Sequence, residues 1–210
     1  EPEIDRHAKT VRFKVYTGTG QAPPPPKIGR GAKFRCLVCG QIAPDQHIKD
    51  EGMAGRIGAQ LMAIVTEGKN GRNYYAPTPE HEVMARQAEP TWRPSGELAD
   101  DARAIWCKLY GLTEFADLFT PRQLVALTTF SDLVGEAREQ VYADALAAGL
   151  PDDGVPLREG GSGARAYAEA VSVYLAFAVD KGANYWSSLC AWHSGRDIIM
   201  STFARQALPM

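Results

Sequence analysis

The pattern of apolar and polar residues divides this chain into a β-rich N-terminal part and a helical C-terminal part. Residues 11–16 alternate apolar and basic side chains, which predicts a half-buried strand, and residues 34–38 are apolar enough for a second, short one. Apolar runs on either side of the turn-forming pair Asn70-Gly71 predict a hairpin over residues 61–76. From residue 120 onward, apolar residues recur every three or four positions, which predicts helices.

The longest predicted helix begins at a strong start signal. Thr120 can serve as the N-cap, Pro121 suits the first helical position, and Gln123 stands three residues after the cap. An apolar stripe then continues for about seven turns, until Gly149 and Pro151 end the helix. The stripe consists of Leu127, Phe130, Val134, Ala137, Val141 and Ala145.

The rest of the C-terminal part is also expected to be helical. An apolar line from Tyr167 to Val179 predicts a second long helix, and residues 184–192 and 197–208 complete the helical region. Residues 152–163, between the two long helices, are rich in Gly and Asp, and we expect a mobile linker. The glycines of this linker resemble a phosphate loop only in composition, because no Lys-Ser/Thr ending and no preceding strand accompany them.

Shorter elements are expected in the N-terminal part. The four consecutive prolines at residues 23–26 favour an extended linker. Residues 45–55 are polar and predict a short helix or turn. Thr78 and Pro79 begin another short helix, which should run to about residue 88.

Composition narrows the class of protein. The chain has 210 residues, of which 45% are apolar and 23% charged, as in ordinary globular proteins. It contains no apolar run of transmembrane length and no secretory signal, and we expect it to be cytoplasmic and without a membrane partner. The chain begins without Met and ends directly after a helical pattern, so we expect it to be a piece of a longer protein.

The cysteines carry the most specific chemical signal. Cys36 and Cys39, followed by Gly40, have the Cys-x-x-Cys spacing of a zinc knuckle, which directs two thiolates at one tetrahedral ion. Structural zinc takes four ligands, so the pair is half a site; His7 and His47 are possible substitute ligands. The alternative is two reduced cysteines in a tight turn, and in this piece of the protein the zinc half-site can be empty, because two thiolates rarely hold zinc alone.

The other two cysteines give weaker signals. Cys107 and Cys190 stand alone in predicted helices, where buried cysteine is common and inert. His193, one helical turn after Cys190, leaves a nucleophilic role formally open. The surrounding tract, residues 185–196, combines aromatic, hydroxyl, His and Arg side chains; it is suited either to stacking bases and holding phosphates or to aromatic core packing.

These patterns together predict an α+β fold, in which a small β-rich module with a zinc-ribbon-like turn and a hairpin precedes a mainly α-helical bundle. Three segments are expected: a strand and Pro-rich linker over residues 1–32, a half zinc ribbon, hairpin and short helix over residues 33–96, and a helical region over residues 97–210.

Charge is distributed unevenly between the two halves of the chain. Residues 1–96 carry 14 Lys/Arg and 10 Asp/Glu, a net charge of +4, whereas residues 97–210 carry 9 and 15, a net charge of −6. A mildly basic N-terminal half is compatible with binding to phosphates. The alternative is that this small excess has no functional meaning.

Several stretches together resemble one family. In order, they resemble the middle of the large bacterial and archaeal adenine-specific DNA methylases that contain a zinc ribbon and an N-terminal domain of unknown function (DUF1156). The resemblance covers residues 11–210 and rests on residues 35–40 (RCLVCG), 55–65 (GRIGAQLMAIV), 77–82 (PTPEHE), 118–124 (LFTPRQL) and 203–210 (FARQALPM).

The resemblance implies a parent enzyme that moves a methyl group from S-adenosylmethionine to the exocyclic amine of adenine. Such enzymes carry a Gly-containing cofactor motif and an Asp/Asn-Pro-Pro-Tyr/Phe catalytic motif that holds a flipped base. This sequence contains neither motif, which in the family lie upstream and downstream of this region. No catalytic or cofactor-binding residue is therefore assigned, and S-adenosylmethionine is expected in the parent only.

An insert between these motifs has two main possible roles. The first is a DNA-contacting, target-recognition module. The second is a structural module that docks a partner or the remaining parts of the methylase chain without touching DNA; an independent enzyme is disfavoured by the missing motifs. The residues expected to contact DNA are Lys33, Arg35, Arg56, Lys69, Arg72 and Arg122.

Overall fold

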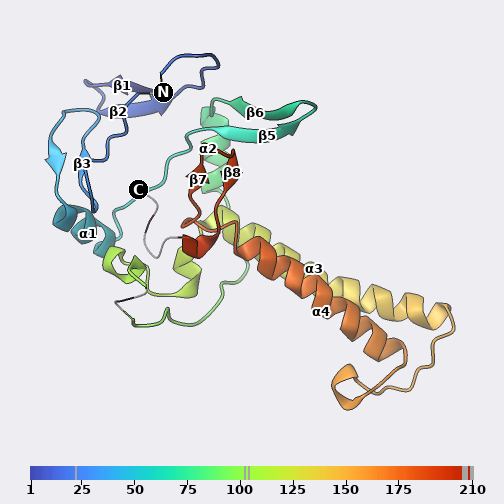
Figure 1. The fold of residues 1–210 in the computed structure, drawn as a ribbon. Helices are drawn as coiled ribbons and strands as arrows, with labels where there is room; N and C mark the ends of the chain where they lie inside the picture. The colour runs from blue at the N-terminus through green and yellow to red at the C-terminus, as the bar shows by residue number, and fades with distance from the viewer. Residues whose placement is uncertain (22, 102, 104, 205–207, 209–210) are drawn as a thin grey trace. The chain divides into compact units, whose positions relative to one another are not determined.

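The computed structural model describes residues 1–21, 23–101, 103, 105–204 and 208, and the structural statements below concern these residues. They form a mixed α+β fold with four α-helices and two-stranded antiparallel sheets, which confirms the predicted class (Figure 1). The chain divides into two compact units, each described here by itself. The first comprises residues 1–88 and 98–113, and the second comprises residues 89–97 and 114–209.

The elements of the first unit are short. In chain order they are β1 (Pro2–Asp5), β2 (Thr10–Phe13), β3 (Phe34–Arg35), β4 (Ile42–Ala43), α1 (Asp45–Met53), β5 (Ile64–Gly68), β6 (Gly71–Tyr75), α2 (Pro79–Arg86) and the 3₁₀ helix η1 (Cys107–Tyr110).

The first hairpin, β1–β2, contains the strand predicted at residues 11–16 but ends it earlier. β2 stops at Phe13, which pairs with Pro2 of β1, and β1 itself was not predicted. The turn between them is held by Asp5, whose Oδ1 accepts hydrogen bonds of 2.9 Å from the backbone N–H groups of His7 and Ala8. This local side-chain bonding sets the turn without any Gly or Pro.

The hairpin predicted over residues 61–76 is confirmed as β5–β6, with a correction to its turn. Gly68 pairs with Gly71, so Lys69 and Asn70 form the two-residue turn rather than Asn70 and Gly71. Neither Lys69 nor Asn70 has a positive φ, whereas Gly71 has φ of +125°. Glycine is therefore used just after the turn, where the chain leaves it through a conformation other residues avoid.

Two further expectations hold in the first unit. The short helix expected at residues 45–55 is α1, and the helix expected to begin at Pro79 is α2. α1 packs against η1 so closely that a Cβ added at Gly52 would lie 2.7 Å from the Tyr110 carbonyl oxygen. The fully buried apolar residues of this unit are Ala32, Leu98 and Cys107.

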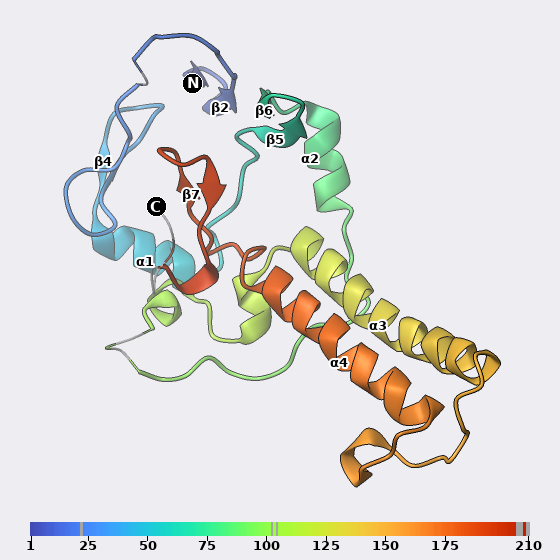
Figure 2. The same ribbon diagram turned by 45° about the vertical axis from the view of Figure 1, so that its right-hand side comes forward.

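The second unit is built on one antiparallel pair of long helices (Figures 1 and 2). Its elements are the 3₁₀ helix η2 (Phe115–Leu118), α3 (Pro121–Ala147), the 3₁₀ helix η3 (Leu157–Glu159), α4 (Ala164–Ala183), β7 (Trp192–His193), β8 (Ile198–Ile199) and the 3₁₀ helix η4 (Thr202–Ala204).

The predicted start of α3 is confirmed in detail. The Thr120 N–H donates to Gln123 Oε1 at 2.8 Å, and the Gln123 N–H donates to Thr120 Oγ1 at 3.4 Å. This reciprocal capping satisfies two backbone N–H groups that the helix itself leaves without partners. The helix runs for 27 residues, as the apolar stripe predicts, and Gly149 follows it with φ of +92°.

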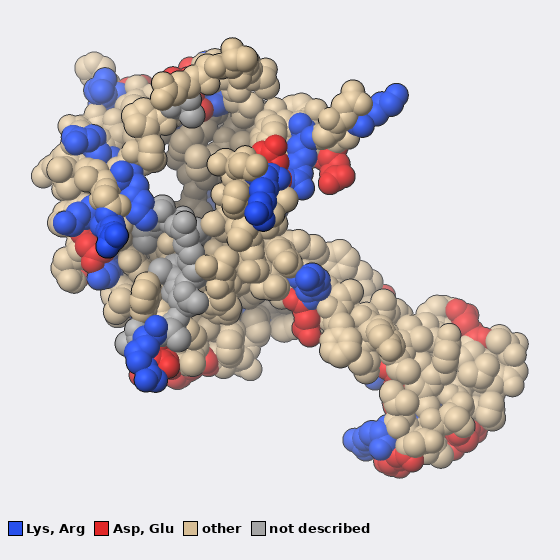
Figure 3. Space-filling view, in the orientation of Figure 1, with Lys and Arg blue, Asp and Glu red and all other residues tan. Residues whose placement is uncertain are grey.

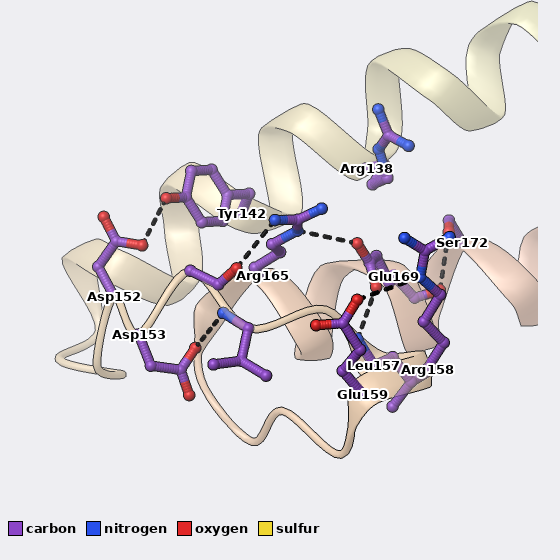
Figure 4. Close-up of polar contacts among 12 residues, drawn as sticks. Arg138, Tyr142, Asp152, Asp153, Leu157, Arg158, Glu159, Arg165, Glu169 and Ser172 are labelled. Carbon is purple, nitrogen blue, oxygen red and sulfur yellow. Dashed lines mark hydrogen bonds and ion pairs between the residues drawn. The ribbon is translucent and has the colours of Figure 1, made fainter.

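The loop between α3 and α4 is anchored, contrary to the expectation of a mobile linker (Figure 4). The Tyr142 hydroxyl donates to Asp152 Oδ1 at 2.8 Å, and Arg165 Nη1 donates to the Gly154 carbonyl at 2.8 Å. Glu169 Oε2 accepts the Leu157 N–H at 2.7 Å. The polar groups of both helices thus bind the loop, a feature that its own composition does not reveal.

The prediction of two helical segments at residues 184–192 and 197–208 is wrong for most of their length. Residues 184–204 form turns, the β7–β8 hairpin and η4, and residues 205–207 of the predicted helix lie outside the described residues. Here side-chain hydroxyls make hydrogen bonds that compete with those of a helix. Ser187 Oγ donates to Thr202 Oγ1 at 2.9 Å, and Ser188 Oγ donates to the Leu118 carbonyl at 2.8 Å.

The helical bundle expected over residues 97–210 is therefore reduced to a two-helix hairpin with short elements around it. Residues 98–113, expected in the helical region, belong to the first unit, whereas residues 89–97 belong to the second. Among the helices of the described residues, none combines the length and the apolar character needed to cross a membrane.

Candidate metal centre and nucleic-acid interface

The Cys36–Cys39 pair occupies a tight turn between β3 and β4. The Gly40 N–H donates to the Cys36 carbonyl at 2.9 Å, and the Cys36 N–H donates to the Gln41 carbonyl at 2.8 Å. Gly40 has φ of +77°, which lets the chain reverse immediately after the second cysteine. Both cysteines are free and exposed, so the local fold presents two thiols at the surface, as the sequence predicts.

The turn also favours the ionised form of Cys36. Backbone N–H groups, that of Cys39 first and that of Val38 next, bond to its sulfur and lower its pKa below the usual thiol value. The Cys39 side chain and the Gly40 N–H act in the same direction, while partial desolvation opposes them. Because the thiolate is the species that binds metal, this arrangement fits a zinc ligand.

The pair remains half a site. Within residues 1–21, 23–101, 103, 105–204 and 208, no three His, Cys, Asp or Glu side chains come together as a metal-binding group. His7 and His47 therefore do not complete the set with Cys36 and Cys39. Zinc bound here would need further ligands from another segment or another molecule.

A hollow of about 400 Å³ lies beside the Cys36–Cys39 turn, and its mostly apolar lining includes two arginines. Arg6 Nε donates to the Val38 carbonyl at 3.1 Å, and Arg35 Nη1 donates to the Gly40 carbonyl at 3.2 Å. The polyproline stretch forms another wall, where the Pro26 carbonyl accepts the Arg35 N–H at 2.8 Å. The lining residues, none of them acidic, are Arg6, Pro24, Pro25, Pro26, Ile28, Arg35, Cys36, Leu37, Val38, Cys39 and Gly40.

Four of the six residues expected to bind DNA are exposed near the knuckle or on the β5–β6 hairpin. Lys33 and Arg35 flank Phe34 on β3, and Lys69 stands at the tip of the hairpin. Arg72 lies opposite Glu67 in the β5–β6 register, which offsets part of its charge. On the face drawn in Figure 3, Lys and Arg side chains stand out around β3 and α1 and at the β5–β6 tip.

The other two expected residues differ from these four, Arg56 in its pairing and Arg122 in the unit to which it belongs. Arg56 makes a bidentate ion pair with Glu51, with both N–O distances at 2.7 Å, and the pair lowers the pKa of the Glu51 carboxyl. Its guanidinium is thus already occupied, which sequence spacing alone does not show. Arg122 is exposed on the first turn of α3, in the second unit.

Arg6 is the functional candidate that the sequence did not single out. It is an ordinary exposed arginine in the turn after β1, and only the fold brings it to Val38, 32 residues further along the chain. The basic stretch over residues 6–14, with four Lys/Arg, was the available signal.

The remaining cysteines have structural surroundings. Cys107 is fully buried, and burial raises the pKa of its thiol. Cys190 Sγ lies 3.4 Å from Ser187 Oγ and 3.7 Å from Thr202 Oγ1, within the polar contacts that hold residues 184–202. In the described part of the chain, the polar contacts of this thiol are with these two hydroxyls and the Asn184 carbonyl, which favours an unreactive cysteine.

Comparisons with protein-family models, with curated proteins and with solved structures found no match for this chain. The resemblance to zinc-ribbon adenine methylases therefore stays a prediction from the residues that carry it.

Proposed function

We propose that this chain is the non-catalytic, DNA-contacting region of an S-adenosylmethionine-dependent adenine-N6 DNA methyltransferase. The observation that carries the proposal is the surface beside the Cys36–Cys39 turn, where Arg6 and Arg35 line a hollow without any acidic residue. Lys33 is exposed and directly precedes β3. Cations held on a folded turn neutralise phosphates and release counterions, which is the main source of affinity in such interfaces.

Within this proposal, Cys36 and Cys39 hold one side of a structural zinc ion, and other ligands come from outside the described residues. Zinc would supply a fixed cross-link for the turn, without taking part in methyl transfer. Arg35 follows the strand directly into the turn, so fixing the turn also fixes the direction of its guanidinium.

The chemistry of methyl transfer is assigned to the parent enzyme. The base must leave the stack to be methylated, and holding the duplex while it does so is the work proposed for this region. The β5–β6 hairpin, with Lys69 at its tip, provides a second basic element of the same unit. Arg56 is a minor candidate because it is paired with Glu51, and Arg122 is a candidate of the second unit by itself.

The test is duplex-DNA binding by the full chain, measured by fluorescence anisotropy at several salt concentrations. The double variant Lys33→Gln/Arg35→Gln should weaken binding and reduce the slope of log K against log salt by about 0.9 for each lost phosphate contact. The matched control is Arg86→Gln, an exposed arginine of the same unit that pairs with Glu82 on α2. Equal affinities for the double variant and the wild type would contradict the proposal.

A second candidate function is a docking module that makes no DNA contact. It is favoured by the acidic C-terminal half and by the long, anchored α3–α4 hairpin, whose apolar side chains are only partly covered. The same titration separates the two: a docking module would bind duplex DNA no better than the Lys33→Gln/Arg35→Gln variant does.

A further inference from the structure

One side of the α3–α4 hairpin carries an apolar groove of about 370 Å³. Its middle is lined by small side chains, Ala137 on α3 and Ala178 on α4, so the backbone of both helices is accessible to a bulky group. Phe130 and Trp186 close one end, with ring centroids 5.8 Å apart. The full lining is Phe130, Leu133, Val134, Ala137, Leu175, Ala178, Val179 and Trp186.

A ridge of aromatic side chains stands beside this groove on α4. Tyr174 is 76% exposed and Phe177 is 61% exposed, and their rings meet edge-on with centroids 6.5 Å apart. Tyr174 and Ala178 are four residues apart, which places them on the same side of the helix. Tyr174 therefore borders the groove, and Phe177 stands at its outer edge. We call the groove and these two residues the hairpin face.

The segment of α4 that carries this face has no charged residue. Residues 170–179 read AVSVYLAFAV, apolar around almost the whole helix circumference. A helix of this composition is normally buried on all sides, because exposing it to water brings no compensating polar contact. Among the described residues of the second unit, α3 is the main element packed against it, and much of its surface is exposed and available for another molecule.

We propose that the hairpin face pairs with the same face of a second copy of this chain in a two-fold dimer. A two-fold interface is self-complementary: each surface must hold both the knob and the hole. The Tyr174–Phe177 ridge supplies the knob, and the groove over Ala137 and Ala178 supplies the hole. α3 of one copy then lies against α4 of the other, which makes a four-helix arrangement from two hairpins.

The exposed area matches what such a dimer needs. Five large apolar residues of α3 and α4, including both members of the ridge, and the adjoining Trp186 are each between 42% and 76% exposed. With about 200 Å² for each aromatic side chain, they offer roughly 600–700 Å² per copy, close to the ~800 Å² per partner of a standard stable interface. The six residues are Phe130, Leu133, Tyr167, Tyr174, Phe177 and Trp186.

The charges that border the face suit this pairing. Glu136 stands one turn after Leu133 on α3, and Lys181 stands one turn after Phe177 on α4. Pairing of α3 with α4 of the second copy brings these two opposite charges towards each other, whereas pairing of α3 with α3 does not, so they favour the proposed arrangement.

The inference is independent of DNA binding and is tested by sedimentation velocity of the full chain between 1 and about 200 µM, a range that covers micromolar dimers. We expect a concentration-dependent dimer for the wild type. The variant Tyr174→Ser/Phe177→Ser should dissociate at least tenfold more readily, because it removes the knob. The matched control Tyr16→Ser/Tyr75→Ser removes two exposed tyrosines of the first unit and should dimerise as the wild type does.

A second variant guards against misfolding as the cause of dissociation. Ala178→Glu places a charge in the hole without shortening the helix, and it should also give monomers, with an unchanged far-UV circular dichroism spectrum. A wild type that stays monomeric at about 200 µM would overturn the proposal, as would dimers unaffected by both variants. Monomers that bind an unrelated amphipathic helix would assign the face to a different occupant and would equally overturn it.

Discussion

The two units of this protein reach a defined structure by different means. In the first, the fully buried apolar residues are Ala32, Leu98 and Cys107, and the strands are two to five residues long. In the second, nine apolar residues, Leu124, Leu127 and Leu189 among them, are buried around helices of 27 and 20 residues. Backbone turns and close contacts between backbone segments thus hold the first unit in its fold, whereas packing of apolar side chains holds the second.

This difference teaches where each unit is vulnerable. A unit with few buried apolar residues depends on a few close contacts that leave no space for a larger side chain. The contact of Gly52 with the Tyr110 backbone is one of them. A unit built on long capped helices spreads its stabilisation over many contacts, and single changes there should cost less. Substitutions of the same kind in both units therefore test the comparison directly.

The largest effect is expected for Gly52→Ala in the first unit. The new Cβ would lie 2.7–2.9 Å from three backbone atoms of Tyr110, which cannot rotate away as a side chain can. We expect a loss of about 2 kcal/mol in the free energy of unfolding, the scale of an overpacked core. Urea unfolding gives the magnitude, and hydrogen exchange over residues 45–53 and 107–110 locates it.

The control for this prediction is Gly135→Ala in the middle of α3. No atom lies within 4 Å of a Cβ at that position, and Ala is the better helix former. This variant should stabilise the second unit by about 0.5–1 kcal/mol. If Gly52→Ala left the free energy of unfolding unchanged, or if both changes lowered it by the same amount, the two units would not differ as described.

A smaller effect is expected when the cap of α3 is removed. Thr120→Ala removes the Oγ1 acceptor of the Gln123 N–H and should cost about 1 kcal/mol. Thr120→Ser keeps the acceptor and serves as the matched control. If thermal unfolding shows no difference between these variants, the stability of the hairpin comes from packing alone.

The smallest and most specific effect is expected on the pH dependence of stability, through the anchored loop between α3 and α4. The Leu157 N–H, followed by Arg165, lowers the pKa of the Glu169 carboxyl in the folded protein. A carboxyl whose pKa is lowered on folding contributes stability above its unfolded pKa of about 4.3, and that contribution is lost as the pH falls through this range towards the folded value.

The variant Glu169→Gln should therefore flatten the acid side of the stability profile between about pH 6 and pH 3 while changing little on the alkaline side. Hydrogen exchange of the Leu157 amide, measured across the same pH range, reports the loop itself. Glu159→Gln, an exposed neighbour paired only with Arg158, is the control and should leave the profile as it is. A wild-type profile that matches that of Glu169→Gln would show that the loop is held by other contacts.

The sequence was sufficient to predict those elements that depend on residues close together in the chain. The Thr120 cap, the apolar stripe of α3, the start of α2 and the β5–β6 hairpin follow from residues a few positions apart, and the structure confirms them. The Cys36–Cys39 turn is of the same kind, because Gly40 and neighbouring backbone bonds define it.

Features that depend on distant residues could not be predicted. The Ser188–Leu118 bond joins positions 70 residues apart and helps to turn a predicted helix into loops and β7–β8. Arg6 reaches the knuckle across 32 residues, and Glu51 occupies Arg56 through a pairing five residues apart that matches no helical spacing. Counting charged residues in the sequence locates a basic region, but the fold decides which of its Lys and Arg side chains are free to contact another molecule.

The capped and anchored α3–α4 hairpin also fixes the distance between its two ends. At 1.5 Å per residue, the 27 residues of α3 span about 40 Å, a little more than one turn of B-form DNA. Because Thr120 caps one end and Tyr142 and Glu169 fix the loop at the other, the rod cannot shorten by fraying. The loop is thereby held at a constant separation from the N-terminal end of α3.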